Sequence, residues 1–191
     1  MAKTQTVQTQ LPEEDYLAGE RLSPERHEYV DGQVYLMAGA SKRHSEIAVN
    51  LTTALRLGAR KTSCKVYAAD MKVRVVGRKS YYYPDVVVSC EQDDEDDYYL
   101  ENPCLIIEVL SESTAKRDRS EKLLAYMNIP TLRAYLLVEQ DRAELEFFYK
   151  NADGGWWVET FSGLEAVVKL PCPAISLSLA DVYEGVLLAT K

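Results

Sequence analysis

Two acidic residues lie in strongly apolar segments of the chain, where acidic residues are uncommon. Glu108 lies in the run Leu105–Leu110, whose other members are all large and apolar, so we expect a strand that is buried on both faces. An isolated buried carboxylate is costly, so it must pair with a cation, bind a metal ion or stay protonated. Asp85 opens a second apolar run, residues 85–90. If the two strands pair, both carboxylates lie near one strand end.

Two carboxylates at one point repel each other unless a cation lies between them. Mg²⁺ suits such a pair, because it takes one or two protein carboxylates and completes its shell with water and phosphate oxygens. The pair therefore indicates a magnesium site. Each acid also has a structural explanation. Glu108 can form a buried salt bridge with a base of the covering helix, and Asp85 can cap a backbone N–H at a turn.

A helix predicted over Ala115–Met127 offers a basic partner. Asp118, Lys122 and Tyr126 follow one another at i, i+4 and i+8 along one ridge, next to the inward stripe. Lys122 can bury its stem and bring its ammonium to the acid pair, with Asp118 and Tyr126 as secondary candidates. An i,i+4 salt bridge between Asp118 and Lys122 on a solvated face is the alternative.

A second long helix is predicted after Ser41, a suitable N-cap. At 100° per residue, His44 falls on the stripe of apolar side chains, whereas Glu46 falls on the opposite side. The stripe comprises Ala48, Leu51 and Leu55. His44 is therefore a further candidate for the site, although an inward histidine is more often a hydrogen-bonded core residue. Glu28, beside the Asp31-Gly32 turn, is a weaker candidate.

The elements that must position these residues occur in a mixed order. A hairpin is predicted at Asp31-Gly32 and precedes the first long helix. Strands are expected over residues 63–69, 71–76, 85–90 and 104–110 before the second helix, and over 133–140, 143–150 and 156–161 after it; short helices are expected near 12–19 and 179–183. This order predicts a mixed α/β sheet flanked by helices, with an N-terminal β-hairpin and C-terminal antiparallel strands.

The length of 191 residues fits one domain. We expect a flexible tail over residues 1–10 and a single domain over 11–191. No run of 18 apolar residues and no signal-peptide core are present, so we expect a cytoplasmic protein without membrane association. A nucleotide cofactor is not expected because the chain has no phosphate-binding G-x-x-x-x-G-K-[ST] run.

The formal charge of −8 excludes a uniformly basic nucleic-acid-binding protein. The charge is divided unevenly. Residues 91–101 carry seven acids and are expected to form a solvated loop, whereas residues 42–79 carry ten bases and two acids. If the bases fold to one side they can bind phosphate, but charge alone favours the simpler explanation of solvated helix and strand edges. Candidate DNA-binding side chains are Lys42, Arg43, Lys116, Arg117 and Arg119.

Four cysteines, at positions 64, 90, 104 and 172, form no Cys-x-x-Cys pair, and their spacings match no zinc module. We expect four buried or half-buried thiols in a reducing compartment and no disulfide framework.

The joint run PDVVV, LIIEVLSEST and RDRSEKLLAY resembles a large bacterial family of restriction-endonuclease-like proteins within the PD-(D/E)-x-K nuclease superfamily. The resemblance spans about residues 11–149. It implies a restriction-endonuclease-like core, DNA as substrate, and Mg²⁺, with Mn²⁺ as a substitute, held by Asp85, Glu108 and the Val109 carbonyl. The superfamily pattern has lysine two residues after the acid, where this chain has Leu110. The resemblance implies that Lys122 supplies the missing ammonium.

We therefore expect a Mg²⁺-dependent DNA endonuclease in which Lys122 orients the attacking water or stabilises the transition state, and His44 helps to position water or metal. The alternative is a nuclease-like DNA-binding or assembly module without turnover, which the displaced lysine and the acidic total charge favour. A purely structural homodimer domain is a third possibility. Cleavage of both strands of a duplex suits a twofold dimer, so a homodimer is expected.

Overall fold

The computed structural model describes residues 10–90 and 96–188. The tail predicted over residues 1–10 lies outside this part, apart from Gln10, and so does the segment 91–95 of the acidic run. The helices are α1 (Glu13–Glu20), α2 (Lys42–Gly58), α3 (Ala115–Arg117), α4 (Leu123–Tyr126) and α5 (Leu179–Val182), with a 3₁₀ turn η1 (Val76–Arg78) and a π-helical turn η2 (Asp118–Lys122).

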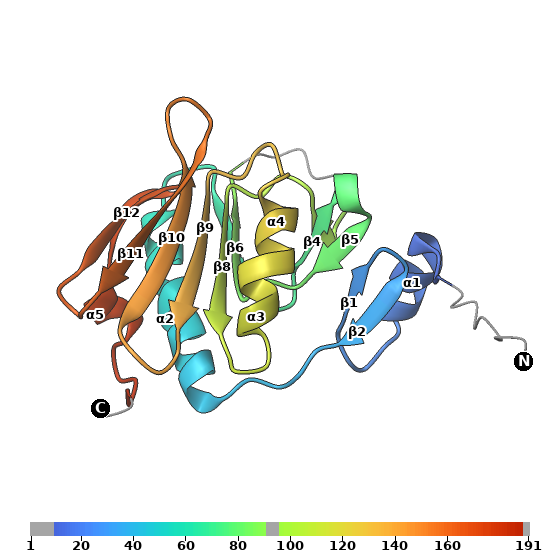
Figure 1. The fold of residues 1–191 in the computed structure, drawn as a ribbon, viewed down its shortest axis with the longest axis horizontal. Coiled ribbons are helices and arrows are strands. Elements are labelled where there is room, and N and C mark those ends of the chain that lie inside the picture. Colours follow the sequence, from blue (N-terminus) through green and yellow to red (C-terminus); the bar gives the residue numbers. More distant parts are fainter. Residues whose placement is uncertain (1–9, 91–95, 189–191) are drawn as a thin grey trace, which may run out of the picture.

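The prediction of a mixed α/β sheet is confirmed. The main sheet has the strand order β11-β10-β9-β8-β6-β3, in which β8 and β9 are parallel and all other neighbours antiparallel. Its strands are β3 (Lys65–Ala68), β6 (Val86–Ser89), β8 (Leu105–Leu110), β9 (Ala134–Glu139), β10 (Glu144–Lys150) and β11 (Trp156–Ser162). Figure 1 shows β8 in the middle of this sheet, as its continuous apolar sequence predicts.

Helices cover both faces of the main sheet. Alternation along β8 sends Leu105, Ile107 and Val109 to the face covered by α2 and α5, and sends Ile106 and Leu110 to the face covered by α3 and α4. Glu108 has the same parity as Ile106 and Leu110, so it points toward the α3–α4 side. Figure 1 shows α3 and α4 lying in front of the sheet and α2 behind it.

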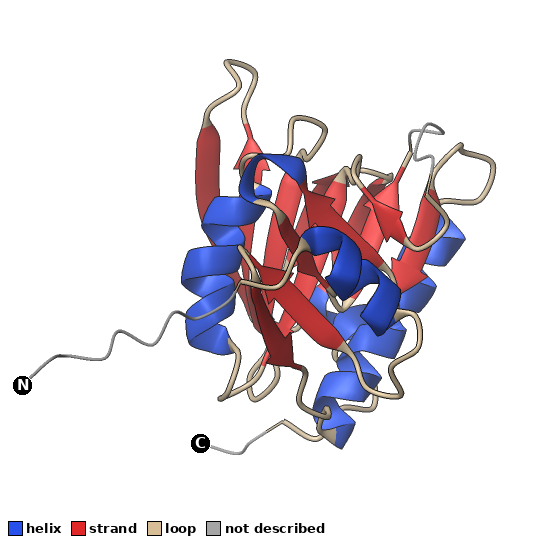
Figure 2. Ribbon diagram, turned by 90° about the vertical axis from the view of Figure 1, so that its right-hand side faces the viewer, coloured by secondary structure: helices blue, strands red, loops and turns tan. Residues whose placement is uncertain are grey.

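A second, smaller sheet leads into strand β6 of the main sheet. Its strand order is β2-β1-β5-β4-β7, with β1 (His27–Val30), β2 (Gln33–Leu36), β4 (Lys72–Val75), β5 (Ser80–Tyr82) and β7 (Tyr99–Leu100). The chain leaves β5 through Tyr83 and Pro84 and enters β6 of the main sheet at Val86. Asp85 therefore lies at the passage from one sheet to the other. Figure 2 views the molecule from the side of the smaller sheet.

The hairpin predicted at Asp31-Gly32 is confirmed, with β1 and β2 joined by these two residues alone. Both have positive φ, 45° and 87°, as a tight hairpin turn requires. Gln10 packs over Gly32 so closely that a Cβ there would lie 2.5 Å from the Gln10 Cβ. This contact fixes the start of the described chain on the hairpin.

The two long helices differ in regularity. Helix α2 begins after Ser41, whose side chain accepts a hydrogen bond from the His44 N–H at 3.1 Å, as predicted. The second helix is not continuous, because the π-helical turn η2 separates α3 from α4. A π turn is wider than an α turn and occurs often at functional sites.

Four further features of the fold differ from the sequence prediction. Strand β5 and the hairpin of β12 (Val167–Pro171) and β13 (Ala174–Ser178) were not predicted, and residues 99–100 of the acidic run form β7 beside β4 instead of a loop. The expectation of four separate thiols is wrong: the structure pairs Cys64 with Cys90 and Cys104 with Cys172 as disulfides. Sequence spacing could not show this, because each pair joins segments that meet only through the tertiary fold.

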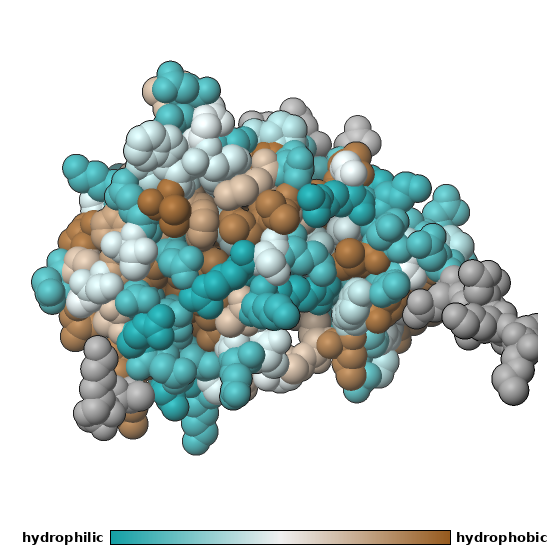
Figure 3. Space-filling model, in the orientation of Figure 1, coloured by the Kyte–Doolittle hydropathy of each residue, from teal (hydrophilic) through white to brown (hydrophobic). Residues whose placement is uncertain are grey.

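Most of the surface in Figure 3 is hydrophilic, with hydrophobic groups in small separate patches. Exposed apolar side chains come from different elements, for example Val49, Leu124 and Trp157. Within the described residues, none of the helices has the length and hydrophobicity that a membrane-spanning segment needs.

The packing of α2 gives a test of the fold. Leu51 is fully buried against the main sheet, whereas Val49 on the same helix is 63% exposed. We expect Leu51→Ala to lower the free energy of unfolding by about 2–5 kcal/mol, because it leaves a cavity, and Val49→Ala to change it by about 0.5 kcal/mol or less. Urea unfolding followed by circular dichroism measures both. Equal losses would show that α2 presents another face to the sheet.

Candidate functional site

Asp85 and Glu108 meet across the β6–β8 pair. Val86 lies opposite Ile107, so Asp85 and Glu108 occupy the next position of the antiparallel ladder. Asp85 Oδ2 accepts a hydrogen bond of 2.7 Å from the Val109 N–H, which fixes this carboxylate beside the strand that carries Glu108. The structure thus brings together the two acids that the sequence singled out.

The ammonium of Lys122 lies among three carboxylates. Lys122 Nζ is 3.0 Å from Glu108 Oε1, 2.9 Å from Glu28 Oε1 and 3.3 Å from Asp118 Oδ1. Only 6% of the Lys122 side chain is exposed, and the three acidic side chains are equally buried. The sequence offered two alternatives for Lys122, a contact with the acid pair or a salt bridge with Asp118. The structure combines them, because the ammonium contacts both Glu108 and Asp118.

The π turn η2 explains how Asp118 and Lys122 both face inward. Both lie in this five-residue turn, and both are buried. Tyr126 follows in α4, and its hydroxyl donates to Glu108 Oε1 at 3.2 Å. Glu108 therefore receives hydrogen bonds from two side chains of the same helical segment, at the spacing that the ridge of Asp118, Lys122 and Tyr126 predicts.

His44 reaches the site from the opposite helix. It lies in the first turn of α2, and its Nε2 is 3.2 Å from Asp85 Oδ2, with 14% of the side chain exposed. Burial lowers the pKa of His44, but the hydrogen bond and charge of Asp85, aided by the Val109 carbonyl, outweigh burial and raise this pKa above its ordinary value. His44 is thus a hydrogen-bonded partner of Asp85.

Glu28 is more central than the sequence indicates. Its Oε1 contacts Lys122 Nζ, and its Oε2 accepts a 2.6 Å hydrogen bond from Arg117. The sequence placed Glu28 only beside a hairpin turn. No local signal could rank it higher, because its partners lie 89 and 94 residues further along the chain.

The electrostatics of this site decide the protonation state of its lysine. Burial lowers the pKa of Lys122, but Glu108, Glu28 and Asp118 outweigh it, so the pKa lies well above its ordinary value. Burial raises the pKa of Glu108 well above its usual range, against the opposing effect of Lys122, and burial also raises the pKa of Asp118. Lys122 therefore remains an ammonium, which donates hydrogen bonds and cannot accept a proton.

The donor set fits a divalent cation. Glu28, Glu108 and Asp118 contact Lys122, Glu28 also contacts Arg117, and Asp85 lies beside Glu108, so acidic groups outnumber the permanent cations of the site. Asp118 Oδ1 is buried and, despite its closeness to Lys122, makes no hydrogen bond. Among the residues that the structure describes, only cysteines bring three ligand atoms within 4.8 Å of one another, so the acids do not form a three-ligand group. Mg²⁺ commonly takes only one or two carboxylates from a protein and completes its shell with water and phosphate oxygens.

The predicted phosphate-binding side chains divide into two groups. Arg43 pairs with Asp141, Arg117 pairs with Glu28 and Glu121, and Arg119 pairs with Glu139 and Glu146. Lys42 and Lys116 are exposed. The three arginines therefore support the fold through carboxylates, and the two lysines project into solvent.

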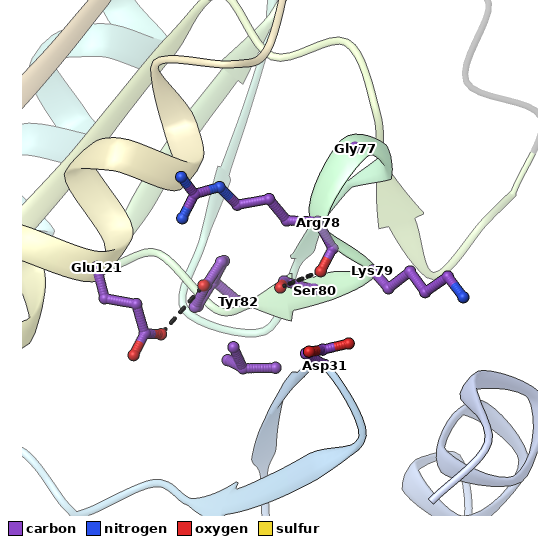
Figure 4. Close-up of a pocket in the computed structure, with 8 residues that line it drawn as sticks. Asp31, Gly77, Arg78, Lys79, Ser80, Tyr82 and Glu121 are labelled. Atoms are coloured by element: carbon purple, nitrogen blue, oxygen red, sulfur yellow. Dashed lines mark hydrogen bonds between the residues drawn. The ribbon is translucent and has the colours of Figure 1, made fainter. Parts of the chain in front are cut away.

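A cleft of about 470 Å³ lies next to this site. Its walls are the hairpin turn at Asp31, the segment Gly77–Tyr82 and Glu121 of η2. Figure 4 shows the Arg78 guanidinium extending toward the helix that carries Glu121, while Lys79 points away. Tyr82 lines the cleft, and its ring centroid is 5.9 Å from Lys122 Nζ. The Tyr82 ring therefore borders both the cleft and the site.

Comparisons with known proteins find a matching family model and two relatives. The family model Uma2, described as "Putative restriction endonuclease", matches residues 13–180. An uncharacterized protein of Synechocystis sp. is 38% identical over 178 residues, covering 92% of both chains, and a second one is 33% identical over 158 residues, covering 81% of this chain and 89% of the relative.

A solved structure has the same fold. It is the crystal structure of a putative nuclease belonging to DUF820 from Anabaena variabilis, with a TM-score of 0.75. The two chains are 17% identical, and the likeness covers 93% of this chain and 99% of that one.

Removal of the buried ammonium tests the electrostatics. We expect Lys122→Met to lower the free energy of unfolding by about 3–5 kcal/mol, because three buried carboxylates lose their shared cation. Adding Glu108→Gln to Lys122→Met should restore part of this loss, since it removes one of the uncompensated charges. Urea unfolding at pH 7 measures both variants.

The matched control is Lys116→Met, which removes an exposed lysine of the same segment. We expect it to change the free energy of unfolding by about 0.5 kcal/mol or less. If Lys122→Met were as mild as this control, the ammonium would not compensate the three carboxylates.

Proposed function

Since the chain belongs to the Uma2 family of putative restriction endonucleases, we propose that it is a Mg²⁺-dependent endodeoxyribonuclease that hydrolyses phosphodiester bonds. The observation that carries the proposal is the convergence of Asp85, Glu108 and Lys122 from three separate elements. Two carboxylates and an ammonium at one point are what metal-assisted phosphodiester hydrolysis needs. The lysine arrives from η2, fourteen residues after Glu108, although Leu110 occupies its usual position.

In this proposal Asp85, Glu108 and the Val109 carbonyl hold the Mg²⁺, for which Mn²⁺ can substitute. The ion supplies positive charge at the scissile phosphate and lowers the pKa of a bound water. Other groups of the protein hold the two carboxylates in position. The Val109 N–H and His44 hold Asp85, and Tyr126 holds Glu108.

Lys122 acts in this proposal as a fixed positive charge. It cannot serve as a general base, because the surrounding carboxylates raise its pKa. Its ammonium orients the attacking water or stabilises the negative charge that develops on the phosphate. Glu28 and Asp118 keep the ammonium charged and in place.

DNA binding in this proposal rests on the basic side chains that project into solvent or line the cleft. Lys42, Lys116 and Arg78 have these positions. Arg43, Arg117 and Arg119 would first have to leave their carboxylate partners. We further propose a homodimer, since two copies related by a twofold axis can cut both strands of a duplex.

A cleavage assay tests the reaction. We expect the protein to nick supercoiled plasmid in Mg²⁺ or Mn²⁺ and to be inactive in EDTA. Glu108→Gln should lower the rate by about 100-fold or more, since it removes a charged metal ligand while keeping its shape. The matched control is Glu112→Gln, an exposed acid on the same segment, which should keep the parental rate.

Two outcomes contradict the proposal. Equal nicking by Glu108→Gln and the parent protein would remove Glu108 from the mechanism. Salt-sensitive DNA binding that needs no Mg²⁺ and leaves the plasmid intact would instead identify a DNA-binding module without turnover.

His44 gives a second, graded test. Because it holds Asp85 without occupying the predicted ligand positions, we expect His44→Gln to lower nicking by about 10- to 100-fold and to raise the Mg²⁺ concentration needed for half-maximal rate. Excess Mg²⁺ should recover part of the activity. A loss that no concentration of Mg²⁺ relieves would argue for a role other than holding Asp85.

A further inference from the structure

Four cysteines converge at the end of the main sheet opposite the acidic site. Cys64 precedes β3, Cys90 follows β6, Cys104 precedes β8, and Cys172 lies between β12 and β13. They come from four segments that are far apart in sequence. Cys104 and Cys172 are buried, and Cys64 and Cys90 are half-buried.

Three of their sulfur atoms form one cluster, and the fourth, that of Cys104, joins it through Cys90 and Cys172. The Sγ atoms of Cys64, Cys90 and Cys172 all lie within 4.8 Å of one another. Cys90 Sγ is 3.2 Å from Cys172 Sγ and 3.5 Å from Cys104 Sγ. Cys90 therefore contacts both sulfur atoms of the other disulfide in addition to its own partner, Cys64.

Two independent disulfides do not require this convergence. A disulfide needs contact between two sulfur atoms only, and nothing in a pair of cross-links draws four sulfur atoms to one point. A soft metal ion does require it, because structural zinc is held tetrahedrally by four thiolates. At a Zn–S distance of about 2.3 Å, the sulfur atoms of such a site are about 3.8 Å apart. Cys90 Sγ lies somewhat closer than this to Cys172 and Cys104, at 3.2 Å and 3.5 Å, and the two bonded pairs must separate when they are reduced.

We propose that the reduced chain binds one Zn²⁺ ion through the thiolates of Cys64, Cys90, Cys104 and Cys172. Thiolate ligands favour zinc over the hard Mg²⁺ ion of the acidic site. An iron–sulfur cluster fits less well, since inorganic sulfides and several iron atoms between the cysteines would hold the four Sγ atoms farther apart.

In this proposal the four sulfur atoms have two alternative states, two disulfides or four thiolates that bind zinc. A dithiol reductant supplies four electrons and four protons to convert the two disulfides into four thiols. Binding of Zn²⁺ then releases the four thiol protons, because each ligand is a thiolate. Oxidation and zinc binding therefore exclude each other at these four sulfur atoms.

The site has a structural role that is independent of the nuclease site. It ties the β12–β13 turn to the ends of three strands of the main sheet. Cys90 lies five residues after Asp85 on an extended strand, so the two sites are about 17 Å apart. Zinc bound only by the folded chain stabilises the fold by mass action.

Metal analysis of the whole protein tests the proposal. The parent protein is purified in a metal-free reductant, given zinc sulfate and freed of excess metal. Mass spectrometry of the metals should find about one zinc per chain. Cobalt substitution should give the intense thiolate-to-cobalt absorption of a tetrahedral sulfur site. Removal of the zinc by a chelator should lower the melting temperature.

Variants locate the ion. Cys64→Ser changes a half-buried ligand and should weaken zinc binding by more than the about 10- to 100-fold typical of outer-shell partners. Asp85→Asn alters the acidic site and should keep about one zinc per chain. Circular dichroism checks that each variant is folded. If Cys64→Ser does not fold, the zinc content and cobalt spectrum of the parent protein still decide the question.

Three results overturn the proposal. The first is a reduced parent protein that is zinc-free with four alkylatable thiols. The second is iron in place of zinc. The third is zinc that is lost in Asp85→Asn and kept in Cys64→Ser. Retention of about one zinc in the reduced parent and in Asp85→Asn supports the proposal.

Discussion

The buried contact of Lys122 with three carboxylates organises this molecule. Glu28 comes from the N-terminal hairpin, Glu108 from the centre of the main sheet and Asp118 from the π turn that also carries the lysine. The ammonium thereby joins the two sheets and the helical segment that covers them. The three carboxylates raise the pKa of Lys122, whereas burial is the main cause of the raised pKa of Glu108.

Sequence reasoning could identify the two acids of the sheet because their surroundings are local. Glu108 is conspicuous inside an apolar strand, and Asp85 opens another, so their pairing follows from strand adjacency alone. The ridge of Asp118, Lys122 and Tyr126 was visible for the same reason, since helical spacing places all three on one side. The turn at Asp31-Gly32 and the cap at Ser41 were also local signals, and the structure has both.

The rest depended on contacts between distant segments. Glu28 owes its position to a hairpin that folds against a helix about 90 residues away, and no neighbouring residue marks it. The π turn does not alter the apolar pattern of its helix, so periodicity predicted a continuous one. The cysteines lack the paired spacing of a zinc module because each comes from a different segment, and only the closure of the sheet brings them together. The pairing of Arg43, Arg117 and Arg119 with carboxylates also reduced the positive surface that the sequence indicated.

The paired strands β6 and β8 carry the carboxyl groups of Asp85 and Glu108 toward one end and the sulfur atoms of Cys90 and Cys104 at the other. The central claim concerns the oxygen end, and a crystal soaked in Mn²⁺ tests it most directly. We expect an anomalous peak in contact with the carboxylates of Asp85 and Glu108, with Lys122 still bound to Glu108. Crystals that show no peak between these acids at saturating Mn²⁺, or a peak only elsewhere, would contradict the proposed cation site and the hydrolytic function built on it.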